Sequence, residues 1–191
     1  MDFVEQRFVL RLEKNLDNPG AAPLLCAGIT MYSPLRQYNV NKGDKIGIIG
    51  LGGLGHMGIK LAVAMGAEVV AITSSQSKSR DAIDLGADQV LVSTDEGATE
   101  SAAGTFDLLI NTIPADHDFS QYLGLLKRDK TMVIVGASHM KMFSMNLLFG
   151  RKKVAGSLIG GIKETQEMLD FCAKNSIKNH ILKHQPQLNY L

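Results

Sequence analysis

Six glycines crowd into twelve residues of this chain, and their spacing suits the binding of a phosphate. The segment is "GIIGLGGLGHMG", residues 47–58, in which Gly50, Gly52 and Gly55 fit the pattern G-x-G-x-x-G. In that pattern the first glycine permits a tight turn, the second lets a pyrophosphate approach the backbone, and the third lets a helix pack closely on a strand. A short apolar run precedes the glycines and helically spaced apolar residues follow them. We therefore interpret the segment as a dinucleotide-binding turn at the start of a helix, and not as a turn that serves packing alone.

The residues after the next apolar run favour NADP over NAD. An NAD site usually places an Asp or Glu about 20 residues beyond the glycines, where the carboxylate binds the adenosine ribose. This sequence has "TSSQSKSR" there, residues 73–80, which offers hydroxyl groups and two cations but no acid. The alternative is a polar helix start capped by Ser or Thr, with solvated basic side chains. We favour a site for the 2′-phosphate of NADP at Thr73, Ser74, Ser75 and Lys78.

Cysteine and histidine spacing by itself does not predict a metal site. Cys26 lies in an apolar stretch, where a lone cysteine usually packs in the core, and a zinc ion needs three or four ligands. Cys172 shares a helical stripe with Met168 and Leu169, so we expect it in the core. The five histidines show no Glu-x-x-His or similar spacing, and we assign them surface or capping roles.

The elements that must position these residues alternate between strand and helix. Apolar runs predict strands at residues 45–50, 68–73, 89–94, 106–113, 131–136 and 153–160. Amphipathic spacing predicts helices at residues 54–65, 78–86, 118–129 and 163–175. Because parallel neighbours need crossover connections, this order predicts an α/β fold with a doubly wound, six-stranded parallel sheet of the Rossmann type.

Length and charge limit the class of protein further. The chain has 191 residues, 20% of them charged, with a formal net charge of +1. We expect one main domain, no nucleic acid as partner and no membrane span, in a cytoplasmic protein. Residues 1–20 predict a strand pair or extended arm, and residues 178–191 an irregular tail.

Three segments together carry a resemblance to a known family. They are "AAPLLCAGITMYSPL", "GLGGLGHMGIKLAVAMGAEVVAITSS" and "GSLIGGIKETQEMLDF", and the resemblance extends over about residues 1–176. The chain resembles the zinc-dependent medium-chain dehydrogenase/reductases, in particular the cinnamyl alcohol dehydrogenase group. That resemblance implies a barrel-like zinc domain joined to a Rossmann domain, and NADP(H)-dependent interconversion of primary alcohols and aldehydes. It divides the chain into a remnant of the catalytic domain and linker (1–25), an NADP-binding Rossmann domain (26–177) and the tail (178–191).

The resemblance also assigns roles to individual residues. Cys26 resembles the last protein ligand of the catalytic zinc, which reverses the reading from spacing alone. The expected cofactor contacts are Thr30, Gly50, Leu51, Gly52, Gly53, Leu54, Gly55, Thr73, Ser74, Ser75, Lys78, Thr112, Gly136, Ser157, Leu158 and Ile159. Of these, Thr112, Gly136 and residues 157–159 correspond to the nicotinamide half of the family's site.

Other parts of the family's catalytic machinery have no counterpart in this sequence. These are the two further catalytic zinc ligands, the four cysteines of the structural zinc site, and the hydroxyl that begins the proton relay. We therefore assign no catalytic residue and expect cofactor binding without turnover by this chain alone. The resemblance further implies a homodimer through the sheet edge around "VAGSLIG". A non-catalytic NADP-binding or dimerisation module remains the alternative, and a complete zinc-free reductase is disfavoured because Cys26 sits in the zinc-type motif.

Overall fold

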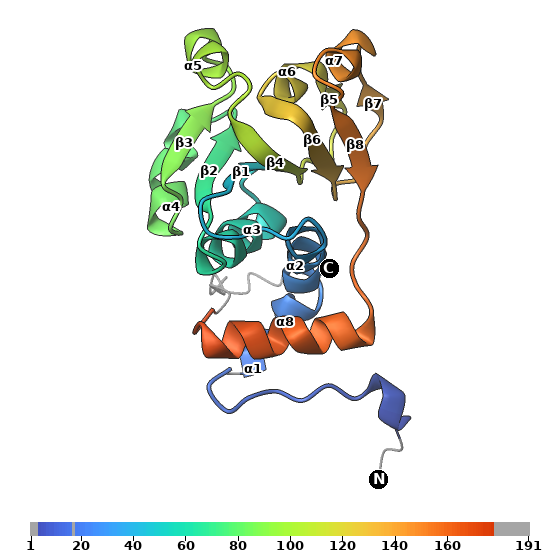
Figure 1. Ribbon diagram of the computed structural model, residues 1–191. Coiled ribbons are helices and arrows are strands. Elements are labelled where there is room, and N and C mark those ends of the chain that lie inside the picture. The colour runs from blue at the N-terminus through green and yellow to red at the C-terminus, as the bar shows by residue number, and fades with distance from the viewer. Residues whose placement is uncertain (1–3, 17, 178–191) are drawn as a thin grey trace, which may run out of the picture.

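A six-stranded parallel sheet forms the centre of the computed structural model, which describes residues 4–16 and 18–177 (Figure 1). Its strand order is β3-β2-β1-β4-β6-β8, and all five neighbouring pairs are parallel. The strands are β1 (Lys45–Ile49), β2 (Glu68–Thr73), β3 (Gln89–Val92), β4 (Phe106–Asn111), β6 (Leu126–Ile134) and β8 (Lys153–Gly156). The order runs outward in both directions from β1 and β4, so the predicted doubly wound sheet is confirmed. A second, small sheet pairs β5 (His117–Asp118) with β7 (Met140–Lys141).

Helices connect and cover these strands. The α-helices are α1 (Asn18–Ala21), α2 (Ala27–Gln37), α3 (Gly53–Ala64), α4 (Ser79–Asp84), α5 (Glu96–Ser101), α6 (Ser120–Leu123), α7 (Met145–Leu148) and α8 (Ile162–Lys174). Three short 3-10 segments are η1 (Gln6–Phe8), η2 (Ala22–Leu25) and η3 (Gln76–Lys78). None of the helices within the described residues is long and apolar enough to cross a bilayer.

Two apolar clusters explain why the strands are hydrophobic on both faces. Ile46 and Ile48 of β1 belong to one cluster, together with residues of α2, α3 and α8. Ile49 belongs to the other, with aromatic residues such as Phe106 and Phe119. A parallel strand is covered on both faces, so nearly every one of its side chains can be apolar. This is why short unbroken apolar runs predicted the strands correctly.

Glycine ends the helix that follows the first strand. Gly66 has a φ of 86°, and the N–H groups of Gly66 and Ala67 donate to the carbonyls of Val63 and Ala62. These two bonds satisfy carbonyls that the last helical turn leaves free, and the left-handed backbone at Gly66 costs little without a Cβ atom. The predicted helix end at Gly66 is therefore confirmed.

The helix predicted over residues 118–129 is wrong for most of its length. Only Ser120–Leu123 is helical, and β6 already begins at Leu126. Leu123, Leu125 and Leu126 are all buried in the second apolar cluster. Leucines at such spacings could equally lie on the buried face of a helix, so the pattern did not distinguish a helix from a strand. Tertiary packing decides between the two, because β6 lies between β4 and β8 and pairs with both. The expected arm over residues 4–16 has one 3-10 turn and no strand, and the predicted tail at 178–191 lies outside the described residues.

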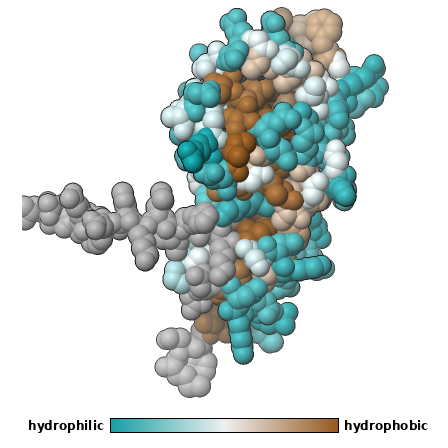
Figure 2. All heavy atoms as spheres, turned by 90° about the vertical axis from the view of Figure 1, so that its left-hand side faces the viewer, coloured by the Kyte–Doolittle hydropathy of each residue, from teal (hydrophilic) through white to brown (hydrophobic). Residues whose placement is uncertain are grey.

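Figure 2 shows the surface of the molecule on the side of the sheet that carries β3 and α4. On the side that carries β3 and α4, hydrophilic side chains cover most of the coloured surface, and an apolar band crosses its upper half (Figure 2). Polar and charged groups beside an edge strand discourage pairing with another chain. The polar and charged groups on this face therefore disfavour pairing of β3 with another chain.

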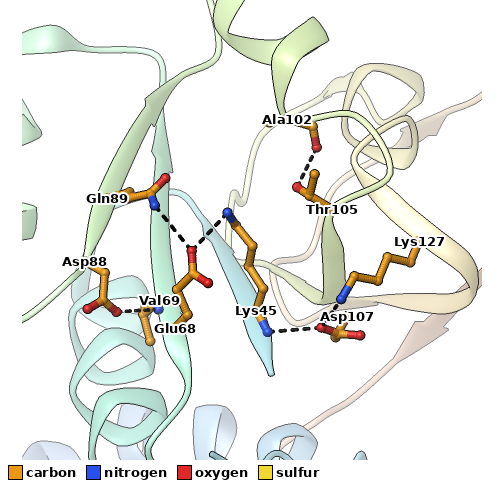
Figure 3. A network of polar contacts seen from close by, with 9 residues as sticks. All are labelled: Lys45, Glu68, Val69, Asp88, Gln89, Ala102, Thr105, Asp107 and Lys127. Carbon is orange, nitrogen blue, oxygen red and sulfur yellow. Dashed lines mark hydrogen bonds and ion pairs between the residues drawn. The ribbon is translucent and has the colours of Figure 1, made fainter. Parts of the chain in front are cut away.

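Ion pairs and hydrogen bonds join the amino-terminal ends of β1, β2 and β4 (Figure 3). Lys45 Nζ lies 3.0 Å from Glu68 Oε1, and the Lys45 N–H donates to Asp107 Oδ2 at 3.1 Å. Lys127 Nζ and Lys130 Nζ approach the same carboxylate at 2.7 and 3.1 Å. Burial by itself raises the pKa of Asp107, but the hydrogen bonds from Lys127, the Lys45 backbone and Lys130 together hold the pKa below its ordinary value of 3.8.

The Asp107→Asn variant is expected to lower the free energy of unfolding by about 1–2 kcal/mol at pH 7, because it removes charge-assisted bonds from a largely buried carboxylate. A carboxyl whose pKa is lowered by folding stabilises the fold above its unfolded pKa, and this contribution disappears as the pH falls through the folded pKa. Urea unfolding at a series of pH values should therefore show the difference from wild type shrinking below about pH 4. Asp129→Asn, in an exposed pair with Arg151, is the matched control and should cost less. Equal losses in both variants would contradict this account.

Candidate functional site

A cleft of about 410 Å³ opens at the carboxyl ends of β1, β4 and β6. It lies where the strand order reverses, between β1 and β4, which is the position at which doubly wound sheets bind ligands. Three chain segments and one lysine line it, namely Gly50, Leu51, Gly52, Gly53, Leu54, Thr112, Ile113, Pro114, Val135, Gly136, Ala137 and Lys78. The glycine-rich turn predicted from sequence is thus one wall of the cleft.

The three glycines of the pattern have different structural roles. A Cβ atom on Gly55 would lie 2.0 Å from the carbonyl oxygen of Gly50, so only hydrogen fits where α3 crosses β1. Gly50 itself has a φ of 92°, which an L side chain rarely adopts. A Cβ atom on Gly52 would meet nothing within 4 Å, so its backbone is open toward the space beside it. Close packing therefore needs Gly50 and Gly55, whereas Gly52 leaves room for a ligand.

The amino terminus of α3 points its first N–H groups toward this turn. Gly52 is the N-cap residue, no side chain caps the helix, and its first turn holds no acidic residue. The positive end of a twelve-residue helix is thus left to an external acceptor. A phosphate group is the ligand that such an end binds best.

Thr112 and Gly136 shape the cleft from the β4 and β6 sides. The Thr112 hydroxyl donates to the carbonyl of Ile49 at 2.8 Å and to that of Gly50 at 3.2 Å, which ties the end of β4 to the glycine-rich turn. A Cβ atom on Gly136 would lie 2.6 Å from the carbonyl oxygen of Ile113. Both residues line the cleft, as expected. The Thr112 hydroxyl is bonded to backbone carbonyls, and the space beside Gly136 is filled by the backbone of Ile113.

The segment predicted to hold a 2′-phosphate lies at the end of β2. Thr73 is buried and its hydroxyl accepts the Ser75 N–H at 3.2 Å. Ser74 is exposed, the Ser75 and Ser77 hydroxyls are 2.7 Å apart, and Lys78 lines the cleft. Hydroxyl groups therefore lie close in sequence to Lys78, which is the one residue of this segment among those that line the cleft.

The remaining expected contacts are distributed over two places. Ser157 and Leu158 line a second hollow of about 350 Å³, which shares Val135, Gly136 and Ala137 with the main cleft. Ile159 follows them with a φ of 44°. Thr30 is buried within α2, and it is not among the residues that line either space. The sequence analysis did not identify four further lining residues, which are Ile113, Pro114, Val135 and Ala137. They line the cleft because they follow the carboxyl ends of β4 and β6. The rule that ligands bind at the carboxyl ends of parallel strands could have predicted them.

The two cysteines lie in unlike environments. Cys172 packs against Met168 in the core, as its helical stripe predicts, and burial raises its thiol pKa to about 12. Cys26 is exposed immediately before α2. Within residues 4–16 and 18–177, no three His, Cys, Asp or Glu side chains gather as a metal site. The described residues therefore do not fit a complete zinc site, although Cys26 is free to act as one ligand.

Comparisons with known proteins agree with this geometry. Residues 53–174 match the family model described as zinc-binding dehydrogenase. The chain is 51% identical over 178 residues to aldehyde reductase YahK of Escherichia coli, covering 91% of this chain and 51% of that protein. It is 47% identical over 180 residues to NADP-dependent alcohol dehydrogenase C 1 of Mycolicibacterium smegmatis, covering 93% and 52%. This chain thus spans about half the length of these curated relatives.

Two solved structures share the fold closely. A cinnamyl alcohol dehydrogenase of Sorghum bicolor superposes with a TM-score of 0.89 at 43% identity, over 92% of this chain and 51% of that one. The CAD of Helicobacter pylori, solved in complex with NADP(H), gives a TM-score of 0.83 at 40% identity, over 92% and 50%. The similarity covers the sheet and the cleft together.

Alanine at Gly55 and at Gly52 should separate packing from ligand binding. We expect Gly55→Ala to lower the free energy of unfolding by about 1–3 kcal/mol, because its methyl group collides with the Gly50 carbonyl. Gly52→Ala should unfold like wild type but bind NADPH at least tenfold more weakly, because its methyl group enters the space left for the pyrophosphate. Urea unfolding and calorimetric titration measure the two effects. Wild-type affinity in Gly52→Ala would show that no pyrophosphate approaches this backbone.

Proposed function

Because this chain belongs to the zinc-binding dehydrogenase family and is of the cinnamyl alcohol dehydrogenase type, we propose that it is the cofactor-binding part of an NADP-dependent alcohol dehydrogenase. That enzyme would interconvert primary alcohols, including those of the cinnamyl kind, and aldehydes. The observation that carries the proposal is the cleft at the reversal of strand order, with the open backbone of Gly52 and the free amino terminus of α3 in its wall.

The proposed binding mode assigns each part of NADP to a different chain segment. The pyrophosphate would lie on Gly50 to Leu54 and the start of α3, and the 2′-phosphate against Ser74, Ser75 and Lys78. The nicotinamide end would lie toward Thr112, Gly136 and residues 157–159. When bound, NADP supplies or accepts the hydride. The protein supplies a fixed wall, since Thr112 holds the glycine-rich turn and Gly136 lets the end of β6 approach the segment after β4.

Zinc enters the proposal only through Cys26. Its thiol is exposed and suits the role of one ligand, but a zinc ion needs three or four. We propose that the other ligands and the proton relay belong to a part of the enzyme outside this sequence. No step is assigned to zinc on the residues described.

We propose that residues 1–25 form an arm and linker that connect the Rossmann domain, residues 26–177, to that other part. The arm lies along α8 (Figure 1). Gln166 accepts the Arg11 N–H at 2.8 Å and donates to the Arg11 carbonyl at 3.1 Å, and Asn15 donates to the Ala173 carbonyl at 2.7 Å. Val9 and Leu12 remain exposed, which leaves apolar surface for a neighbouring domain.

A homodimer through the β8 end of the sheet is also proposed. In the described part of the chain β8 pairs with β6 alone, so its outer edge is open. Leu158 is 84% exposed and Ile159 51%, and both follow β8 directly. An open edge beside exposed apolar side chains is suited to pairing with a second copy.

The preference for NADP is expected to depend on Ser75. Ser75→Asp places a carboxylate where the 2′-phosphate would bind, so NADPH affinity should fall at least tenfold while NADH affinity holds or rises. Calorimetry with each nucleotide gives the two constants. Ser101→Asp, which adds the same charge at the far end of α5, is the control. An unchanged ratio of the two affinities in Ser75→Asp would contradict the assignment.

The chain alone should bind NADPH without turning over an alcohol or aldehyde, since the described residues do not complete a zinc site. Absorbance at the reduced-nicotinamide band, with cinnamyl alcohol or cinnamaldehyde and added zinc, checks turnover. A steady rate above background would refute the claim that the remaining ligands lie elsewhere. Failure to bind NADPH at all would favour the alternative of a purely structural dimerisation module.

Sedimentation velocity should find the wild-type chain as a dimer and Leu158→Glu mainly as a monomer, because the new charge would be buried at the proposed interface. Ile83→Glu on α4 is a matched control, since Ile83 is half exposed near the opposite edge of the sheet. Its dimer should be unaffected. A monomeric wild-type chain would argue against the interface.

A further inference from the structure

Asn111 ends β4 immediately before the cleft-lining segment 112–114, and it is fully buried. A buried amide side chain is costly unless its oxygen and nitrogen have hydrogen-bond partners. The sequence predicted a strand over residues 106–113 and assigned no role to Asn111. Its polar group therefore calls for a specific explanation.

Asn111 is bonded to both of the loops that face the glycine-rich turn. Its Oδ1 accepts the Ile113 N–H at 3.0 Å, which closes a local turn in the segment 112–114. Its backbone carbonyl accepts the N–H groups of Val135 and Gly136 at 3.0 and 3.2 Å. The orientation of this one residue thus fixes two walls of the cleft.

The nitrogen of the Asn111 side-chain amide is hydrogen-bonded to His117. The Nε2 atom of His117 lies 2.9 Å from Asn111 Nδ2, and its Nδ1 lies 2.6 Å from the Ala115 carbonyl oxygen. Because a carbonyl can only accept, Nδ1 carries the hydrogen and Nε2 is left to accept from the amide. The ring is stacked on Phe119, with centroids 4.4 Å apart, and lies edge-on to Tyr122. In this arrangement a neutral His117 ring has a hydrogen-bond partner at each nitrogen.

Protonation of His117 would break this chain of hydrogen bonds. A second N–H on the ring would face the Asn111 amide hydrogens, donor against donor. Rotating the amide would satisfy the ring but would turn its NH₂ group toward the Ile113 N–H, again donor against donor. With a charged ring, the Asn111 amide cannot keep both its bond to Ile113 and its bond to His117.

Several charged groups surround this pair. Asp116 and Asp118 flank His117 in the sequence. Lys141 lies on β7, which pairs with β5, and His139 lies immediately before β7. Asp116 is engaged by the N–H and ring of His139, at 2.8 and 3.0 Å, and Asp118 accepts the Ser120 N–H at 2.8 Å. Tyr122 is the titratable group that α6 presents to the ring. Both carboxylates thus have hydrogen-bond partners other than His117, although His117 and Lys141 also help to lower the pKa of Asp118 by charge attraction.

We propose that Asn111 and His117 are positioning residues, through which the neutral imidazole holds the wall formed by residues 112–114 and its protonation loosens that wall. The effect on cofactor binding rests on the proposed function, whereas the effect on the wall does not. Histidine is the side chain that changes charge between about pH 5 and pH 8. The nicotinamide side of the cleft is therefore expected to respond to pH across this range.

Hydrogen exchange tests the wall without any cofactor. In wild type, the protection factor of the Ile113 amide, corrected for intrinsic exchange, should fall about three- to tenfold from pH 8 to pH 5, the loss of one hydrogen bond. His117→Gln keeps an oxygen that can accept from Asn111 but cannot titrate, so its Ile113 protection should stay constant. His139→Gln, an exposed histidine on the neighbouring segment, should behave like wild type. The wild-type measurement stands even if a variant folds poorly.

Calorimetry with two nucleotides tests the consequence for binding. Phosphate monoesters themselves change charge near pH 6, so NADP⁺ is compared with 2′-phospho-ADP-ribose, which lacks nicotinamide. From pH 8 to pH 5.5 wild type should lose about three- to tenfold more NADP⁺ affinity than His117→Gln, with equal losses for 2′-phospho-ADP-ribose. Equal losses of NADP⁺ affinity in both proteins would overturn the link to binding.

The outcomes for the two proposals are distinguishable. Constant Ile113 protection in wild type, or the same fall in His117→Gln, would overturn the inference whatever the cofactor does. If NADP⁺ bound to neither protein while Ile113 protection followed His117, the proposed function would fail and the positioning role would be supported.

Discussion

The contact between Gly55 and the carbonyl of Gly50 is the constraint on which the rest of this domain depends. Only a hydrogen atom fits between α3 and the end of β1 at that point. Because the helix crosses so closely, its amino terminus lies directly over the carboxyl edge of the sheet, where β4 and β6 also end. One short approach distance therefore determines both the packing of the helix and the position of the cleft.

The cleft is then held by a relay of polar groups along the strand ends. Thr112 ties β4 to the glycine-rich turn, and Asn111 ties β4 to β6 and to the segment that follows. These links lie at the last residues of the ladder, where the Thr112 and Val135 N–H groups also donate to the Ile49 and Asn111 carbonyls. Residues expected to touch a cofactor thus also hold the wall in place, and the two roles are compatible because a rigid wall is what a preorganised binding site requires.

Much of the fold was predictable because local and tertiary preferences agree. Buried parallel strands must be apolar on both faces, so β1, β2 and β4 appeared as unbroken apolar runs, and Gly66 ended α3 where the left-handed backbone demanded it. The prediction was wrong at residues 124–129, where the leucines suit either a helix or a strand. There the choice depends on pairing between β6 and β4, which brings together segments about 20 residues apart. No local pattern contains that information.

The sequence by itself determined the six strands of the main sheet, the glycine-rich turn and the basic, hydroxyl-rich segment after β2, because each is encoded within a few neighbouring residues. Tertiary structure alone decided which residues meet at the cleft. Ile113, Val135 and Ala137 line it because parallel strands end at one edge, and His117 reaches Asn111 because a short turn folds back on the end of β4. Spacing predicts what each segment forms, but only the assembled sheet brings the ends of distant segments together.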